Sequence, residues 1–312
     1  MKRLHLLIPC TARKSKLVPS QMNLQCHKVE SLDQTVESWC EAFSEQKERI
    51  PAKELYLGQA FSKLKKLSEQ SGYDLEILSA GFGVVNENTI LPSYNATFAT
   101  NENQVPSPKH AWWTAVNGSN LPGRSFKKTF EENSDDVFVI CASNEYLNAI
   151  QYDLQDTFGT FVDSSKKVAI ISTSIPRSLH SYKHCFIKCS RSVLTHCQAS
   201  TFGLSLTDRN ITTIATHLFL CNLELTKLNF SDTIFALNEE IGKLSAPIAV
   251  RRVKCSDDFI LSYIENNIFK NDTKPTSATL ALKQLKSEGF ACTDTRFSTL
   301  YNRIKSKKVS RD

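Results

Sequence analysis

The stretch LHLLIPCTARKS, residues 4–15, shows the pattern from which the fold is predicted: an apolar run that stops abruptly at small and polar residues. The same pattern recurs at 75–81, 137–144 and 168–174. Mainly apolar runs of this length are typical of strands that are buried on both faces. The sequence therefore predicts an α/β fold with a mostly parallel central sheet flanked by helices.

Polar residues follow each predicted strand, and in a parallel sheet these residues share one edge. Ligands of open α/β sheets bind in the crevice beyond the carboxyl ends of the strands. We therefore expect Cys10–Lys14, Ser79–Gly83 and Asn144 to meet at a common rim and to form a binding site. The strand pattern predicts where this site lies and leaves its reaction open.

The composition predicts a globular body with a basic end. The chain has 312 residues, 41% of them hydrophobic, which is enough for a large core and a second, smaller domain. Residues 274–312 hold nine Lys or Arg and three Asp or Glu, and they account for the whole net charge of +6. We predict an α/β ligand-binding or catalytic domain over 1–250 and a helical, basic domain over 251–312. A basic tail on a neutral body favours contact with DNA or RNA, and the alternative is a solvated terminus.

Membrane and metal sites are not expected. No apolar stretch reaches the roughly 18 to 20 residues that span a bilayer, and no secretory signal is visible, so we expect a cytoplasmic protein with reduced cysteines and no membrane partner.

The cysteines and histidines over 184–197 suggest zinc. However, 182–189 is predicted as a strand, on which ligands four residues apart lie about 13 Å from each other. One tetrahedral ion cannot bind both, so no metal site is predicted.

Three helices are predicted at the end of the chain. The second and third are separated by a turn at Gly289 and form a helix-turn-helix pattern. In the third helix, apolar residues at helical spacing leave the basic residues outside the stripe. The residues predicted to contact nucleic-acid phosphates are Arg296, Arg303, Lys305, Lys307 and Lys308. The alternative is a three-helix cap with its charges in solvent.

The loop after the first strand carries several candidate site residues. Thr11, Arg13 and Lys14 offer a hydroxyl group and two cations, which suit a phosphate or another anion. Cys10 is a candidate catalytic nucleophile, because neighbouring cations lower the pKa of a thiol. The alternative is a packed thiol next to exposed loop charges.

The second strand end, Ser79–Gly83, lets the backbone approach a ligand closely. Ser79, Gly81 and Gly83 are therefore predicted to bind the ligand, and the alternative is a tight turn that requires positive φ. Asn86 stands where a dinucleotide fingerprint has its third glycine, and no P-loop Gly-Lys-Ser or Gly-Lys-Thr occurs. Neither a nicotinamide nor an ATP site is expected by these routes, and no cofactor is predicted.

Further candidates lie downstream. Tyr94 is predicted to stack on a base beside Asn95, and the alternative is that its ring fills the core. Asn144 follows the third strand at the same edge of the sheet. Asp208 is the candidate general acid/base and Asn210 an orienting group, while a helix cap is the alternative role of Asp208.

Three segments resemble an uncharacterised bacterial family that has a Pro-Cys-x-x-x-Lys strand end, an Ala-x-x-Leu-Tyr helix and a Ser-Ala-x-x-Gly strand end. The segments are LIPCTARK at 7–14, AKELYLGQAF at 52–61, and ILSAGFG at 77–83 followed by Pro-Ser-Tyr at 92–94. This family is distantly similar to the YaaA proteins and to the uracil-DNA-glycosylase-like domain of archaeosine synthase. The resemblance implies an α/β domain that acts on a nucleobase, nucleotide or nucleic acid, often in DNA modification or phage defence. The Gly-Gln-Asp-Pro-Tyr motif of uracil glycosylases and the N-terminal motif of YaaA are both absent, so base excision is not implied.

Two hypotheses follow for the function. The leading one is a nucleic-acid-associated protein that binds a nucleobase-containing or phosphorylated ligand at its strand ends and contacts nucleic acid through its C-terminal helices. As an enzyme, it would act on a base or a glycosidic bond. The rival is a noncatalytic DNA-binding or adaptor subunit, whose sheet domain serves protein partners in a defence or modification complex.

Overall fold

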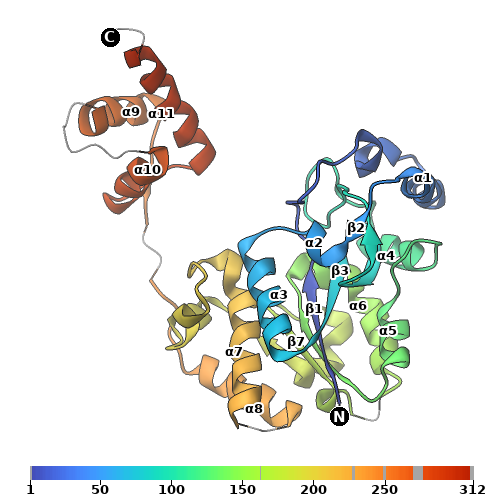
Figure 1. Cartoon of the computed structure of the whole chain (residues 1–312). Coiled ribbons are helices and arrows are strands. Elements are labelled where there is room, and N and C mark those ends of the chain that lie inside the picture. The colour runs from blue at the N-terminus through green and yellow to red at the C-terminus, as the bar shows by residue number, and fades with distance from the viewer. Residues whose placement is uncertain (1, 162, 227–228, 249–250, 270–276, 310–312) are drawn as a thin grey trace. The chain divides into compact units, whose positions relative to one another are not determined.

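The chain forms two compact units, Met1–Pro247 (unit 1) and Ile248–Asp312 (unit 2), and each is described by itself. The structure is a computed structural model that describes residues 2–161, 163–226, 229–248, 251–269 and 277–309 (Figure 1). Unit 1 contains the central sheet, and unit 2 is mostly helical. None of the helices in the described residues combines the length and the apolar character needed to cross a bilayer.

Unit 1 is built on a six-stranded sheet with the order β4-β3-β1-β6-β7-β8. Neighbouring strands are parallel except for β3 and β4, which form an antiparallel hairpin. The strands are β1 (Leu4–Pro9), β3 (Asp74–Ser79), β4 (Gly83–Asn86), β6 (Val137–Cys141), β7 (Val168–Ser172) and β8 (Phe186–Lys188). The predicted fold class is confirmed. The four apolar runs form β1, β3, β6 and β7, because both faces of these strands are covered.

Helices cover both faces of this sheet (Figure 1). On one face, α3 (Gln59–Ser71) contacts β1 and β3, α7 (Ile211–Thr226) contacts β6 and β7, and α8 (Phe230–Gly242) contacts β7 and β8. The other face carries α4 (Lys109–Asn117) and α5 (Phe126–Glu132), both of which pack on α6 (Asn144–Phe158), and α4 also contacts α1 (Leu32–Glu45). The short α2 (Ala52–Leu55) follows β2 (Ile50–Pro51), which pairs with β5 (Ile90–Leu91).

The direction of winding changes between β1 and β6. When only the parallel strands are numbered along the chain, their order is 2-1-3-4-5, so the chain leaves β1 toward one side and later returns to the other. Helices that follow the strands on either side of such a point lie on opposite faces and leave a crevice beyond the carboxyl ends of the strands. The fold therefore places the candidate site between the end of β1 and the start of α6.

The segment 182–189 differs from its prediction as a strand. It forms 3₁₀ turns over Arg177–Cys185, and only Phe186–Lys188 is extended. Leu179 and Cys185 are buried on either side of a kink at Tyr182, where φ and ψ are not helical, whereas a half-buried strand would bury every second residue. Among the described residues, no group of three or more His, Cys, Asp or Glu side chains is placed to hold a metal ion.

Unit 2 has its own hydrophobic core. Its helices are α9 (Asp257–Tyr263), which continues into the π-helical turn η8 (Ile264–Phe269), α10 (Ala278–Ser287) and α11 (Asp294–Val309). The strands β9 (Val253–Lys254) and β10 (Phe290–Ala291) form a parallel pair. The hydroxyls of Ser256 and Ser277 cap α9 and α10, and α10 and α11 form the predicted helix pair.

A cluster of charged side chains is buried at the opposite edge of the unit 1 sheet, near the amino ends of the strands. His5 of β1 is 3% exposed, with its Nε2 3.2 Å from Asp136 Oδ2 and its Nδ1 3.7 Å from Glu76 Oε1. Burial by itself lowers the pKa of His5. The nearby carboxylates of Glu76, Asp136 and Asp74 outweigh this effect, so the pKa of His5 is raised above its ordinary 6.5.

This raised pKa predicts that part of the stability of unit 1 is lost as the pH increases. The protonated His5 ring stabilises the fold below about pH 6.5, and the contribution disappears as the pH passes the folded-state pKa. We expect the difference in unfolding free energy between the wild type and His5→Gln to be largest near pH 6 and to shrink toward about pH 9. Urea titrations over this range measure the difference, and a constant value would contradict the prediction.

Candidate ligand-binding site

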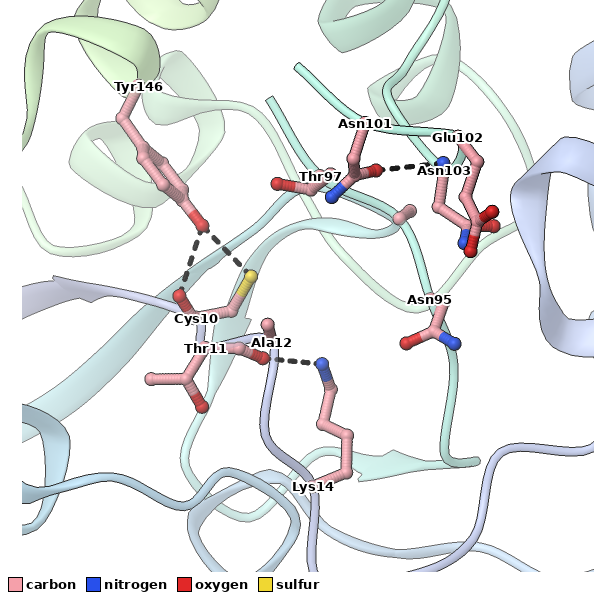
Figure 2. Close-up of a pocket in the computed structure, with 11 residues that line it drawn as sticks. Cys10, Thr11, Ala12, Lys14, Asn95, Thr97, Asn101, Glu102, Asn103 and Tyr146 are labelled. Carbon is pink, nitrogen blue, oxygen red and sulfur yellow. Dashed lines mark hydrogen bonds between the residues drawn. The ribbon is translucent and has the colours of Figure 1, made fainter. Parts of the chain in front are cut away.

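A polar cavity of about 360 Å³ lies at the carboxyl edge of the sheet, beside the point where the winding changes direction. Figure 2 shows the loop after β1 on one side, the loop 95–103 on the other, and Tyr146 of α6 at one end. The residues that line the cavity are Cys10, Thr11, Ala12, Lys14, Asn95, Ala96, Thr97, Asn101, Glu102, Asn103 and Tyr146. The position of the cavity agrees with the position that the strand order favours.

Cys10 and Tyr146 connect the ends of β1 and β6. The backbone N–H of Cys10 donates to the carbonyl oxygen of Leu78 at 2.9 Å, which ties the loop to β3. The Tyr146 hydroxyl lies 3.0 Å from Cys10 Sγ and donates to the Cys10 carbonyl oxygen at 3.2 Å (Figure 2). Burial and the neighbouring Cys10 sulfur raise the pKa of Tyr146, so its hydroxyl stays protonated. A thiol and a phenol are therefore held together at the cavity wall.

Lys14 brings a cation to the same wall. Its Nζ donates to the carbonyl oxygen of Thr11 at 2.5 Å and lies 4.5 Å from the ring centroid of Tyr94 and 5.2 Å from that of Tyr56. Aromatic faces attract an ammonium group and hold it in place. Burial lowers the pKa of Lys14, and the neighbouring Cys10 sulfur opposes this shift. The site thus contains an amine that loses its proton more readily than an exposed lysine does.

Tyr94 lies beneath Lys14 and is fully buried. Its hydroxyl is 2.7 Å from Ser79 Oγ and 2.9 Å from the Tyr56 hydroxyl, and Phe82 packs edge-on against its ring. The predicted stacking of a base on Tyr94 is corrected, because Lys14 and core side chains cover this ring. The alternative interpretation as a core residue is the one that the structure supports.

The turn Ser79–Gly83 also lies in the core. Its carbonyl oxygens accept hydrogen bonds from the indole N–H groups of Trp112 and Trp39 at 2.7 and 2.9 Å. Gly83 has a φ of +84°, which favours glycine. The predicted ligand contacts of Ser79, Gly81 and Gly83 are corrected, because all three are buried and none lines the cavity. This turn supports the floor of the site.

The loop 95–103 presents mostly amide and hydroxyl side chains to the cavity. The Asn95 side chain donates to Asn23 Oδ1 at 2.7 Å, the Thr97 N–H donates to the Asn103 carbonyl oxygen at 3.1 Å, and Asn103 Oδ1 accepts from the Gln25 N–H at 3.2 Å. These bonds fix the wall against the segment around residue 23. Of this loop only Asn95 is a sequence-based candidate, although Asn and Thr are dense over 95–103 and mark a polar loop.

Several predicted site residues lie outside this cavity. Asp208, the predicted general acid/base, is 61% exposed, pairs with Arg191 at 3.0 Å and does not line this cavity. Asn144 and Asn210 bond to nearby serine residues and do not line the cavity, and Arg13 lines a separate one. The three predicted turns share one edge of the sheet, but only the first of them lines the cavity.

The predicted nucleic-acid contacts in unit 2 differ from one another in their surroundings. Arg296 is held by Asp257, to which its Nε donates at 2.6 Å. Arg303 and Lys305 are exposed on α11. The other two predicted contacts are Lys307 and Lys308, and their side chains lie outside the described part of the chain.

One family model matches part of this chain. A model of a family of unknown function, DUF6884, matches residues 41–171, which is less than half of the chain. The matched range includes Tyr146 and the loop 95–103, while Cys10 and Lys14 lie before it. No curated protein and no solved structure matches this chain. The comparisons therefore leave the function to be argued from the site itself.

Proposed function

We propose that unit 1 binds a nucleobase-containing ligand in the polar cavity between β1 and α6. The composition of the cavity carries the proposal: asparagine and threonine side chains of the loop 95–103 lie across from Lys14 and Cys10. An amide side chain offers adjacent donor and acceptor groups, which match the edge of a base. A volume of about 360 Å³ lies within the range of small-molecule sites.

The charges in the cavity favour a base over a phosphate. Among the described residues that line it, Lys14 is the cation and Glu102 is an acid, so a doubly charged phosphate would meet a carboxylate there. A neutral base with several polar edge groups avoids this repulsion. The resemblance to the YaaA proteins and to the archaeosine synthase domain points to the same ligand class, and we include that distant relationship in the proposal.

Base-directed or glycosidic-bond chemistry in this cavity would use Glu102 as general acid/base and Cys10 as nucleophile, because both line it. A noncatalytic adaptor would bind the ligand and release it unchanged. Mass spectrometry of nucleosides and oligonucleotides after incubation with the protein separates these two cases. A product that forms with the wild type and not with Glu102→Gln identifies the enzyme, and unchanged substrates identify the adaptor.

Blocking the cavity is expected to abolish ligand binding. Ala12 is exposed and lines the cavity, and Ala99 is equally exposed on the opposite loop but does not line it. Calorimetry with a panel of nucleobases and nucleosides should detect binding to the wild type and to Ala99→Trp, and a loss of tenfold or more in Ala12→Trp. Binding of no panel member, or equal affinity in both variants, would refute the proposal.

Nucleic-acid binding by unit 2 is a second candidate function. Arg303 and Lys305 are exposed on α11, the second helix of the helix-turn-helix pair, on either side of the buried Ile304. In a groove, a helix with this arrangement would direct one cation toward each phosphate backbone. Unit 2 is therefore proposed to contact DNA or RNA through α11.

Removing both α11 cations is expected to reduce the salt dependence of nucleic-acid binding. Each phosphate contact adds about 0.9 to the slope of log affinity against log salt, so Arg303→Ser/Lys305→Ser should lower the slope by about two. Fluorescence anisotropy with duplex DNA and RNA over a range of salt concentrations measures it. The double variant Lys47→Ser/Lys128→Ser removes two exposed cations of unit 1 and should keep the wild-type slope. Equal slopes in all three proteins would exclude α11 as the contact.

A further inference from the structure

A second cavity, of about 450 Å³, lies beside the polar one and differs from it in charge, because cations line it without an acid. It is lined by three cationic side chains, those of Arg13, Lys63 and Lys66, and among the described residues that line it none is acidic. The two cavities adjoin through Gly58, which lines the second, and Thr11, which lines the first. A Cβ added to Gly58 would lie 3.8 Å from Thr11 Cγ2.

The three cations of this cavity have no protein partner within the described part of the chain: no ion pair or side-chain hydrogen bond involves them. Lys65 of the same helix behaves differently, since its Nζ donates to the Lys53 carbonyl oxygen and lies 3.8 Å from Glu69 Oε1. Like charges gathered without a counter-charge repel one another and attract anions. The cavity therefore has a net positive field that the protein itself leaves uncompensated.

The backbone around the cavity leaves room for an anion. Gly203 lines it and has no side chain, and a Cβ at this position would lie 3.0 Å from Lys63 Nζ. Gly58 precedes α3 with a φ of +133°, and no side chain caps the first N–H groups of that 13-residue helix. These N–H groups add donors and the positive end of the helix dipole to the field of the three cations.

We propose that this cavity binds a phosphate group of a nucleotide or a nucleic-acid strand whose base occupies the adjoining polar cavity. The identity of the attached base rests on the proposed function, whereas phosphate binding rests on the three cations alone. The adjacent residues Arg13 and Lys14 then serve different parts of one ligand, since Arg13 lines the cationic cavity and Lys14 the polar one. The loop after β1 would connect recognition of the base with recognition of its phosphate.

Inorganic pyrophosphate and nucleoside 5′-monophosphates test this proposal in the full chain. The triple variant Arg13→Ser/Lys63→Ser/Lys66→Ser should bind pyrophosphate at least about tenfold more weakly than the wild type, the equivalent of one charge-assisted hydrogen bond. The matched control Lys47→Ser/Lys127→Ser/Lys128→Ser removes three exposed cations elsewhere in unit 1 and should stay within about twofold of the wild type. Equal losses in both triple variants, or none in either, would overturn the proposal.

Parallel titrations with nucleosides separate this proposal from the proposed function. Nucleoside affinity should be the same in the wild type and in the triple variant, while the gain from a 5′-phosphate should vanish in the variant. Pyrophosphate binding that depends on the three cations, without nucleoside binding, would refute the proposed function and support the phosphate site. Nucleoside binding with no gain from a phosphate would sink the phosphate site alone. A short single-stranded oligonucleotide, compared with the monophosphates, distinguishes a strand from a free nucleotide as the source of the phosphate.

Discussion

Replacing Gly123 with alanine is expected to destabilise unit 1 by about 3 kcal/mol or more, the upper end of ordinary overpacking. A Cβ at this position would lie 1.5 Å from the Phe82 carbonyl oxygen and 3.3 Å from Gly83 Cα. The next residue, Arg124, exchanges two backbone hydrogen bonds of 2.9 Å with Val84 of β4. Because the obstructing atoms are backbone, they can move away only if this pairing breaks or the β3–β4 turn shifts.

Urea unfolding of Gly123→Ala measures this loss, and Gly242→Ala provides the matched control. Gly242 ends α8, and nothing lies within 4 Å of the position of its Cβ. Alanine there should be neutral or stabilising by up to about 1 kcal/mol, because it has less freedom to lose on folding. Similar stabilities of the two variants would show that residues 82 and 123 do not approach each other as described.

Replacing Arg124 with methionine is expected to cost about 3–5 kcal/mol, because it leaves a buried carboxylate without its counter-charge. Arg124 Nη2 lies 2.9 Å from Glu76 Oε1, and the Glu76 side chain is 1% exposed. Arg124 also donates to Glu132 and to Thr129, so one guanidinium joins β3 to α5. The unfolding free energy of Arg124→Met near pH 7 measures the effect.

The double variant Arg124→Met/Glu76→Met shows whether the buried charge is the cause. Removing both charges should recover more than half of the loss, since no unpaired carboxylate remains. Lys16→Met tests an exposed ion pair for comparison: Lys16 and Glu48 are 51% and 74% exposed, and losing this pair should cost less than about 1 kcal/mol. A double variant as unstable as the single one would mean that packing of the arginine stem, and not its charge, holds this region.

The strands of the sheet are predictable because each is marked by residues that are neighbours in the sequence. Each apolar run from Leu4, Leu75, Val137 and Val168 is long enough for one strand and ends at polar residues. Helix caps have an equally local signal: a serine stands directly before α9 and before α10, at Ser256 and Ser277. A helix cap or the end of a strand depends on a few neighbouring residues and not on distant ones. Helices and strands can therefore be predicted from the sequence pattern and from hydrogen-bonding chemistry.

The lining of the site was only partly predictable, because it depends on which side of each turn faces the cavity. Arg13 and Lys14 are neighbours in the sequence, yet they line different cavities. Tyr94 is predicted to stack on a base, with a core role as the alternative, and its hydroxyl bonds with Ser79 and Tyr56 in the core. Asp208 had the right chemistry and was placed elsewhere by its own loop. Such choices are set by tertiary packing, which residue type and spacing do not encode.

The buried charged cluster is marked in the sequence by two charged or titratable residues within apolar runs. His5 and Glu76 interrupt two otherwise apolar strands, and a polar residue inside a strand buried on both faces requires a partner. The partners Asp136 and Arg124 come from segments before β6 and after β4, so pairing the residues needed the strand order. A search for isolated charges within apolar runs would have found half of the cluster.

The two walls of the polar cavity differ in what a mutation there would disturb. The wall after β1 rests on Leu78 and on the tyrosines of the core, whereas residues 99–102 of the opposite loop are mostly solvent-exposed. Substitutions in that outer loop can change the shape and charge of the cavity without weakening the strands below. Descendants of one ancestral scaffold could therefore diverge in the lining of this cavity through one short segment while keeping the same framework.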